Sequence, residues 1–134
     1  GMQRAAEEGK PLFIDFTGYG CTNCRLMEEN VWTKSGNLAL LETEFQVVSL
    51  YCDDKTAIPD GEQMISPVTG ELMATYGRQW SDFQSYYFGQ QSQPLYILLD
   101  HKGRLLGDSY GYDPDPEKFK QWLLCGLSRF ESRQ

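Results

Sequence analysis

Residues 12–32 decide the fold and read LFIDFTGYGCTNCRLMEENVW. They begin with a near-continuous apolar run, Leu12 to Phe16, which is typical of a strand buried on both faces. Thr17 to Gly20 then give a turn signal. From Cys21 onward, apolar residues recur at helical spacing with charged residues between them. The stretch therefore predicts a buried strand, a tight turn and a helix that opens on Cys21 and Cys24.

The Cys-x-x-Cys spacing of Cys21 and Cys24 favours redox chemistry in this setting. At the start of a helix, free backbone N–H groups and the helix dipole favour a thiolate on the first cysteine. The second cysteine lies one turn deeper and can attack a mixed disulfide formed by the first. A zinc half-site is the alternative, but the other cysteines, Cys52 and Cys125, form no second pair. We therefore predict no metal site and expect Cys52 and Cys125 to be small buried residues.

Length and composition fit one domain over residues 1–134. The chain is 40% apolar and has 12 Lys plus Arg against 19 Asp plus Glu, a net charge of −7. This acidic balance disfavours nucleic acid and anionic membranes as partners. No apolar run approaches the roughly 20 residues that span a bilayer, so we expect no direct membrane insertion. Gly1 before Met2 reads as a tag remnant, and the chain as an excised domain.

The remaining sequence predicts alternating helices and strands. Helices are expected at residues 2–9, 21–32, around 38–42, 80–89 and 119–130, and strands at residues 12–16, 45–52, 94–100 and 104–110. Residues 53–77 are rich in Asp, Pro, Gly and Thr and read as loop. This order predicts an α/β fold with a central mixed β-sheet and helices on both faces.

Together these features resemble the thioredoxin superfamily, over nearly the whole chain from Lys10. The matching features are Asp15-Phe16 followed by Cys21-Thr22-Asn23-Cys24, the pair Gln93-Pro94 at the place of a cis-proline loop, and Gly111. Within the superfamily, residues 13–32 with Glu28 are most similar to the C-terminal thioredoxin-like domain of the interchange protein DsbD, in a bacteroidetes-like version. The resemblance implies the thioredoxin fold. Residues 53–70 would then be an insertion between the end of the second strand and the third-helix region.

The resemblance also implies roles around the two cysteines. Cys21 is the attacking nucleophile and Cys24 the resolving thiol, while Asp15 accepts the proton of Cys24. Glu28, with Asp15, would raise the pKa of the thiol by like-charge repulsion, whereas Arg25 would act in the opposite direction. The alternatives are that Asp15 is a hydrogen-bonded core acid and that Glu28 and Arg25 are solvated helix residues.

Four further residues are assigned to substrate binding. Pro94 would hold the preceding peptide bond cis, so that the backbone of Gln93 pairs with an extended substrate; the alternative is an edge-strand proline. Tyr19 and Gly20 stand where thioredoxins carry an aromatic residue beside the first cysteine, and Tyr19 either covers the site or only packs.

We therefore expect a thiol:disulfide oxidoreductase with no cofactor besides the Cys21–Cys24 disulfide. The resemblance implies a protein-disulfide reductase that relays electrons in the periplasm, from a membrane-embedded domain of the same parent protein to protein thiol/disulfide partners. The Thr22-Asn23 dipeptide matches neither reducing thioredoxins nor strong oxidants, so it leaves the direction of electron flow open. The alternatives are a free-standing thioredoxin-like reductase or isomerase, and a non-catalytic metal-binding or adaptor domain.

Overall fold

The computed structural model describes residues 2–134, so Gly1, interpreted above as a tag remnant, lies outside it. Its elements in chain order are α1 Met2–Glu8, β1 Leu12–Thr17, α2 Thr22–Met27, η1 Glu28–Trp32, α3 Asn37–Glu44, β2 Gln46–Tyr51, η2 Asp60–Glu62, α4 Tyr76–Phe88, β3 Leu95–Leu99 and α5 Pro116–Ser132. The π-helical turn η1 continues α2 directly. Among the described residues, no helix combines the length and apolar character needed to cross a bilayer.

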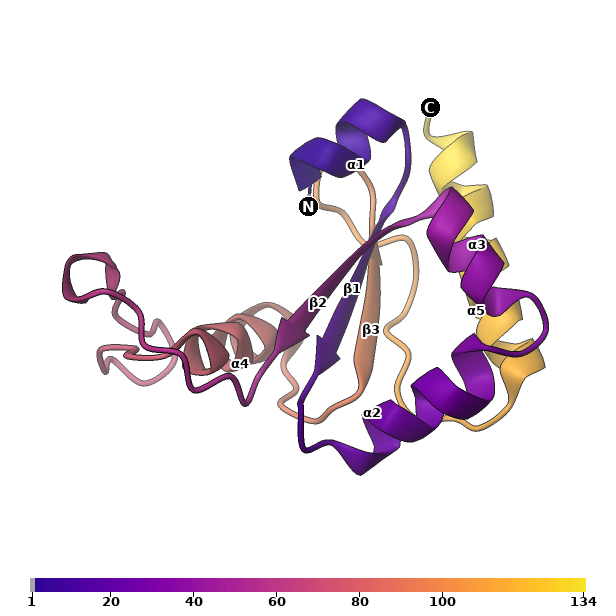
Figure 1. Cartoon of the computed structure of the whole chain (residues 1–134). Helices are drawn as coiled ribbons and strands as arrows, with labels where there is room; N and C mark the ends of the chain where they lie inside the picture. The colour runs from indigo at the N-terminus through magenta and orange to yellow at the C-terminus, as the bar shows by residue number, and fades with distance from the viewer. Residues whose placement is uncertain (1) are drawn as a thin grey trace.

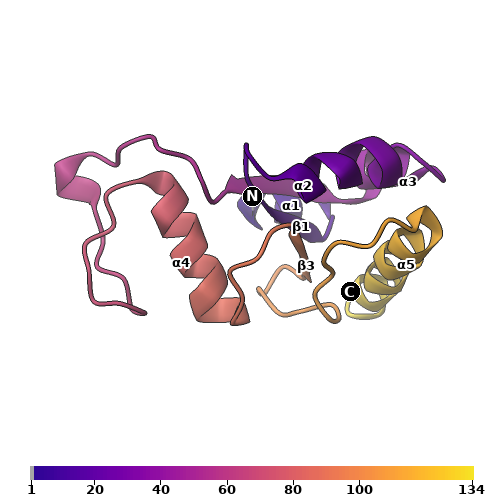
Figure 2. The ribbon, with the colours of Figure 1, turned by 90° about the horizontal axis from the view of Figure 1, so that it is seen from below.

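Three strands form the sheet in the order β2-β1-β3. β1 runs parallel to β2 and antiparallel to β3, which makes the sheet mixed, as predicted. Helices cover both faces: α4 lies on one side of the sheet, and α2, α3 and α5 lie on the other (Figures 1 and 2). This is the thioredoxin fold that the sequence predicts.

The strand predicted over residues 104–110 is wrong. This segment meets β3 only through isolated bridges, Leu99 with Leu105 and Tyr96 with Tyr110. Between the bridges the chain bends at Gly107, whose φ of 153° is a conformation that glycine favours. The neighbouring carbonyl of Leu106 accepts a hydrogen bond from the Arg129 guanidinium of α5 at 2.9 Å. The bend and this contact interrupt the ladder.

Alternation along β1 builds two separate cores. Leu12, Ile14 and Phe16 face α1 and α4, whereas Phe13 faces the side covered by α2, α3 and α5. Because side chains alternate along a strand, Asp15 points to the same side as Phe13. The buried acid of β1 therefore lies on the face that the Cys-x-x-Cys helix covers.

Residues 53–75 leave the body of the fold as a long excursion before α4 (Figure 1). The excursion contains only the short 3₁₀ turn η2 and two isolated bridges, Ala57 with Thr75 and Ile65 with Leu72. A hydrogen bond from the Ser66 hydroxyl to the buried Asp82 carboxylate ties it to α4. It spans the residues expected to be an insertion.

Candidate functional site

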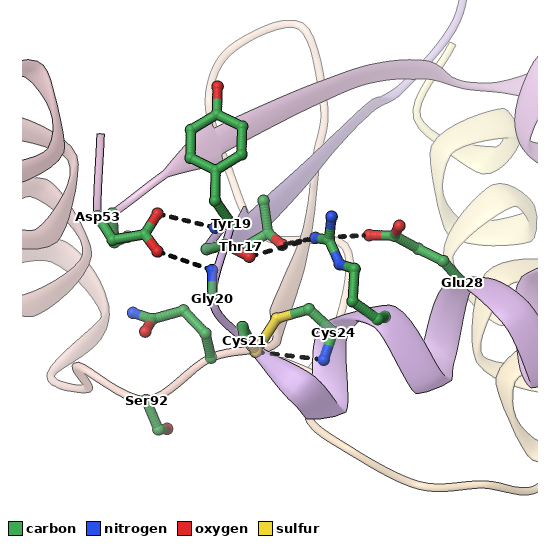
Figure 3. Close-up of a disulfide and its surroundings, with 12 residues drawn as sticks. Thr17, Tyr19, Gly20, Cys21, Cys24, Glu28, Asp53 and Ser92 are labelled. Carbon is green, nitrogen blue, oxygen red and sulfur yellow. Dashed lines mark hydrogen bonds and ion pairs between the residues drawn. A yellow bond between two sulfur atoms is a disulfide. The ribbon is translucent and has the colours of Figure 1, made fainter. Parts of the chain in front are cut away.

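Cys21 and Cys24 form a disulfide at the start of α2 (Figure 3). Their Cα atoms are 5.3 Å apart. Cys21 is the N-cap, and its sulfur accepts the backbone N–H of Cys24 at 3.2 Å. Cys21 is half-buried, whereas Cys24 is only 1% exposed. A partner can therefore reach Cys21 but not Cys24, which supports the predicted order of attack.

Asp15 lies buried in β1, and within residues 2–134 Ser49 is its one hydrogen-bond partner. It is 3% exposed, and its carboxylate accepts the Ser49 hydroxyl of β2 at 3.0 Å. Burial raises the pKa of Asp15 to about 7; the Ser49 bond lowers it, and the Glu28 carboxylate raises it further. An acid with a pKa near neutrality can both accept and release a proton, as general acid–base catalysis requires.

Arg25 and Glu28 form an ion pair on α2 and its continuation η1. The guanidinium lies 3.1 Å from the Glu28 carboxylate, and both side chains are about one-third exposed. The same guanidinium donates to the Thr17 hydroxyl at 2.9 Å and to the Gly18 carbonyl at 3.3 Å. Arg25 thus fastens the helix to the turn before Cys21, and it neutralises part of the charge of Glu28.

Asp53 is a site residue that the sequence motif does not reveal. Its carboxylate accepts the backbone N–H groups of Tyr19 at 2.8 Å and Gly20 at 3.0 Å, directly before Cys21 (Figure 3). These two hydrogen bonds hold the pKa of Asp53 below its usual range, and the bond from Gly20 has the larger effect. The sequence does contain a signal for this contact. Asp53 comes shortly after β2, and the turn at residues 18–20 comes directly after β1. Because parallel strands end at the same edge of a sheet, the two segments are expected to lie close together.

Tyr19 packs rather than covers the disulfide. Its ring stacks on Tyr51 with centroids 4.1 Å apart, and it points away from the Cys21–Cys24 bond (Figure 3). The side chain is 63% exposed. A part for Tyr19 in substrate binding stays a prediction, while Gly20 lines the cavity beside Cys21.

The Gln93–Pro94 peptide bond is cis, as the resemblance implies. Gln93 lines the same cavity as Cys21 and Gly20. Gly111 lies beside this loop, since a Cβ placed on it would come within 3.8 Å of the Pro94 carbonyl oxygen. The cis-proline loop therefore borders the disulfide.

Gln84 of α4 holds this loop in place, and the sequence pattern gives no signal for it. The side chain is fully buried. It donates to the Ser92 carbonyl at 2.7 Å and accepts the Gln93 side-chain amide at 2.9 Å. The Cys52 thiol also contacts its carbonyl oxygen, at 3.7 Å.

The two remaining cysteines differ from the expectation that both are buried. Cys125 is exposed on α5, and Cys52 is half-buried and lines the cavity beside Cys21. Burial, together with the Asp53 and Asp15 carboxylates, raises the pKa of the Cys52 thiol to about 11. In residues 2–134, no three His, Cys, Asp or Glu side chains are grouped as metal ligands.

The profile of the thioredoxin-like domain family matches residues 1–125. This chain belongs to that family. A comparison with curated proteins found no match.

Solved structures of thiol:disulfide proteins share the fold. A DsbH oxidoreductase has a TM-score of 0.67 at 16% identity, over 95% of this chain and 78% of its own. A disulphide isomerase from Xylella fastidiosa Temecula1 has a TM-score of 0.55 at 16% identity; the match covers 98% of this chain and 83% of the isomerase chain. A protein assigned as the thiol:disulfide interchange protein DsbE of Chlorobium tepidum has a TM-score of 0.56 at 25% identity; the match covers 92% of this chain and 84% of that protein's chain.

The arrangement has the parts that thiol:disulfide exchange requires. The accessible sulfur of Cys21 is bonded to the buried sulfur of Cys24 at a helix N-terminus, and Asp15 lies on the strand face behind them. With this cysteine pair and its place in the thioredoxin-like domain family, the domain is a thiol:disulfide oxidoreductase.

Proposed function

We propose that this domain is a protein-disulfide reductase that passes two electrons from a dithiol donor to partner proteins. The observation that carries the proposal is the half-buried Cys21 joined to the buried Cys24 at the start of α2, beside the cis-proline loop. A partner can attack such a pair only at the accessible sulfur of Cys21, and the buried sulfur of Cys24 can then attack the mixed disulfide.

The reaction has two exchange steps. The Cys21 thiolate attacks a partner disulfide, which forms a mixed disulfide and releases one partner sulfur as a thiol after it takes up a proton. Cys24 then gives its proton to Asp15 and attacks the Cys21 sulfur. This step restores the Cys21–Cys24 disulfide and releases the second partner sulfur, so the partner gains two electrons and two protons. A second dithiol reduces the domain again by the same chemistry in reverse.

Electrostatics support the reducing direction. Glu28 and Asp53 place carboxylates around the cysteine pair, and Asp15 adds a further negative charge above its pKa of about 7. Among residues 2–134, Arg25 pairs with Glu28, and no ion pair joins Asp15 or Asp53. Negative charge disfavours thiolates and therefore disfavours the reduced form of the pair. A pair whose reduced form is less stable is a stronger reductant.

The identity of the donor follows from the resemblance to DsbD. We propose that a membrane-embedded domain of the same parent protein reduces Cys21–Cys24, and that the domain works in the periplasm. The similarity of residues 13–32 to the C-terminal domain of DsbD supports this relay. The parent gene tests it, since transmembrane segments encoded together with this domain are expected.

Trapping of the mixed disulfide tests the reductase. We expect reduced Cys24→Ser protein to accumulate a covalent complex with an oxidised peptide, because Cys21 attacks and nothing resolves the adduct. The matched variant Cys21→Ser should form none, because Cys24 is buried. Mass spectrometry under acid quench reads the result. Equal trapping by both variants would contradict the assignment of Cys21 as nucleophile.

A further inference from the structure

The cavity beside the disulfide has a polar lining with one ionised side chain. Its volume is about 330 Å³, and it is lined by Gly18, Gly20, Cys21, Cys52, Asp53, Ser81, Gln91 and Gln93. Asp53 is the charged member of this set. The serine and glutamine side chains offer hydrogen-bond acceptors as well as donors. The exchange steps form and break bonds at Cys21 and Cys24 and move a proton to Asp15. The Asp53 carboxylate adds to the negative charge around the pair but neither reacts nor carries a proton.

Asp53 keeps its negative charge and has no cation of its own. The N–H groups of Gly20 and Tyr19 favour the ionised carboxylate. Over residues 2–134, no Lys or Arg forms an ion pair with Asp53, and the nearby Arg25 is already paired with Glu28. The charge is therefore open to a ligand in the cavity.

The backbone fixes this charge next to the reacting sulfur. Both carboxylate oxygens are bonded to the residues that immediately precede Cys21. A partner chain that pairs with the Gln93 backbone brings its cysteine to Cys21 and a flanking side chain to the cavity. The net charge of −7 also attracts basic partners before contact.

We propose that this cavity is a subsite for a basic side chain, Lys or Arg, beside the reacting cysteine of the partner, with Asp53 as its specificity determinant. The inference rests on the proposed function, because it concerns the substrate of the same disulfide. Amide and hydroxyl oxygens of the lining complete the set of acceptors for an ammonium or guanidinium group.

The test uses three oxidised peptides that differ only in the residue next to the cysteine: Arg, Ser or Glu. Each is mixed with the reduced domain, and the second-order rate constant is measured at low and high salt. We expect the Arg peptide to react roughly five- to tenfold faster than the Glu peptide at low salt, with Ser between them. High salt should shrink this ratio, because it screens an exposed charge pair.

Variants separate the cavity from the overall charge. Asp53→Asn should reduce the Arg-to-Glu ratio to about twofold or less, and Asp53→Glu should keep the preference for Arg. The matched control is Asp54→Asn, because Asp54 carries the same charge one residue away and bonds the Thr56 N–H at 2.9 Å, but does not line the cavity. It should leave the ratio unchanged.

Two outcomes would overturn the inference while the proposed function stands. One is an unchanged ratio in Asp53→Asn, and the other is an equal fall in Asp54→Asn, which would mean that net charge alone sets the preference. The Ser peptide checks the function separately. If it fails to oxidise the wild-type dithiol, the reductase proposal itself fails, and the subsite with it.

Discussion

Asp15 carries the strongest conflict between charge and burial at the site. Its position in β1 is 3% exposed, and its carboxylate accepts a hydrogen bond from the Ser49 hydroxyl. The folded protein therefore holds a proton at this carboxyl up to a pKa of about 7, whereas the unfolded chain loses it near 3.8. Between these values the unfolded state binds fewer protons, so this group lowers the stability of the fold as pH rises through that window.

We predict that Asp15→Asn raises the free energy of unfolding above pH 7. The amide keeps an acceptor for Ser49 but has no charge to bury. The gain should approach, at most, about 4 kcal/mol, from the difference between pKa values of 3.8 and about 7. It should vanish toward pH 4. Urea unfolding of both oxidised proteins across this range measures it, and a gain independent of pH would contradict the account.

We predict that Glu28 influences Cys21 through its ion pair with Arg25. Glu28→Gln removes a negative charge and leaves the guanidinium without its partner. Both changes favour the Cys21 thiolate, so we predict that the variant lowers the pKa of Cys21. The rate of Cys21 alkylation against pH reports this pKa. The matched control is Glu29→Gln, one residue along and exposed. If the pKa of Cys21 is the same in Glu28→Gln as in the control, Glu28 is an ordinary surface residue.

Sequence reasoning found the residues that lie within the motif. Cys21, Cys24 and Asp15 follow from a strand, a turn and a helix that are contiguous along the chain. Asp53 is 34 positions from Tyr19, and its role exists only because β1 and β2 pair in parallel. The exposure of Cys125 depends on how α5 is oriented on the sheet, which periodicity alone does not set.

At the scale of elements, α4 positions both walls of the cavity. Gly77 lets the helix approach the chain after β2 closely, since a Cβ there would lie 2.5 Å from the Asp54 carbonyl oxygen. About two turns further along the helix, Gln84 bonds the Ser92 carbonyl and the Gln93 side-chain amide. A single helix thus sets the position of the Asp53 segment and of the cis-proline loop.

We predict that Gln84→Leu weakens partner binding more than it slows chemistry. The variant leaves the Ser92 carbonyl and the Gln93 amide without this partner, which should lower the free energy of unfolding by about 1–3 kcal/mol. KM for an oxidised peptide should rise, with a smaller change in kcat, because the loop rather than the cysteines is disturbed. The control is Gln79→Leu, half-buried on the same helix. Equal KM values for the two variants would contradict a positioning role.

Most helices and strands could be predicted from periodicity, and the exceptions have causes that periodicity does not contain. α4 begins at Tyr76, before the apolar stripe at Trp80, because the Thr75 side chain caps it by accepting the Arg78 N–H at 3.2 Å. The strand predicted at 104–110 does not form a continuous ladder, because the Leu106 carbonyl accepts a hydrogen bond from Arg129, which is distant in sequence. The β2 strand, at one edge of the sheet, is half-buried, whereas β3, at the other edge, is buried and is bridged by Leu105 and Tyr110.

At the scale of the whole molecule, sheet topology gathers the site. β1 and β2 are parallel and β3 is antiparallel to β1, so two carboxyl ends and one amino end meet at the same edge. Cys21 follows β1, Asp53 follows β2, and Pro94 precedes β3. Three segments that are distant in sequence therefore surround one cavity, with the reactive disulfide at its border.

The central claim is that Cys21 and Cys24 are a reversible redox pair with reducing character. The most direct measurement is an equilibrium titration in thiol/disulfide buffers of graded potential, with thiols trapped and counted by mass. We predict one two-electron transition that involves Cys21 and Cys24 and that Cys21→Ser abolishes. Its midpoint should lie nearer the thioredoxin value of about −270 mV than the DsbA value of about −120 mV. A wild-type protein without a reversible two-thiol transition would contradict the account.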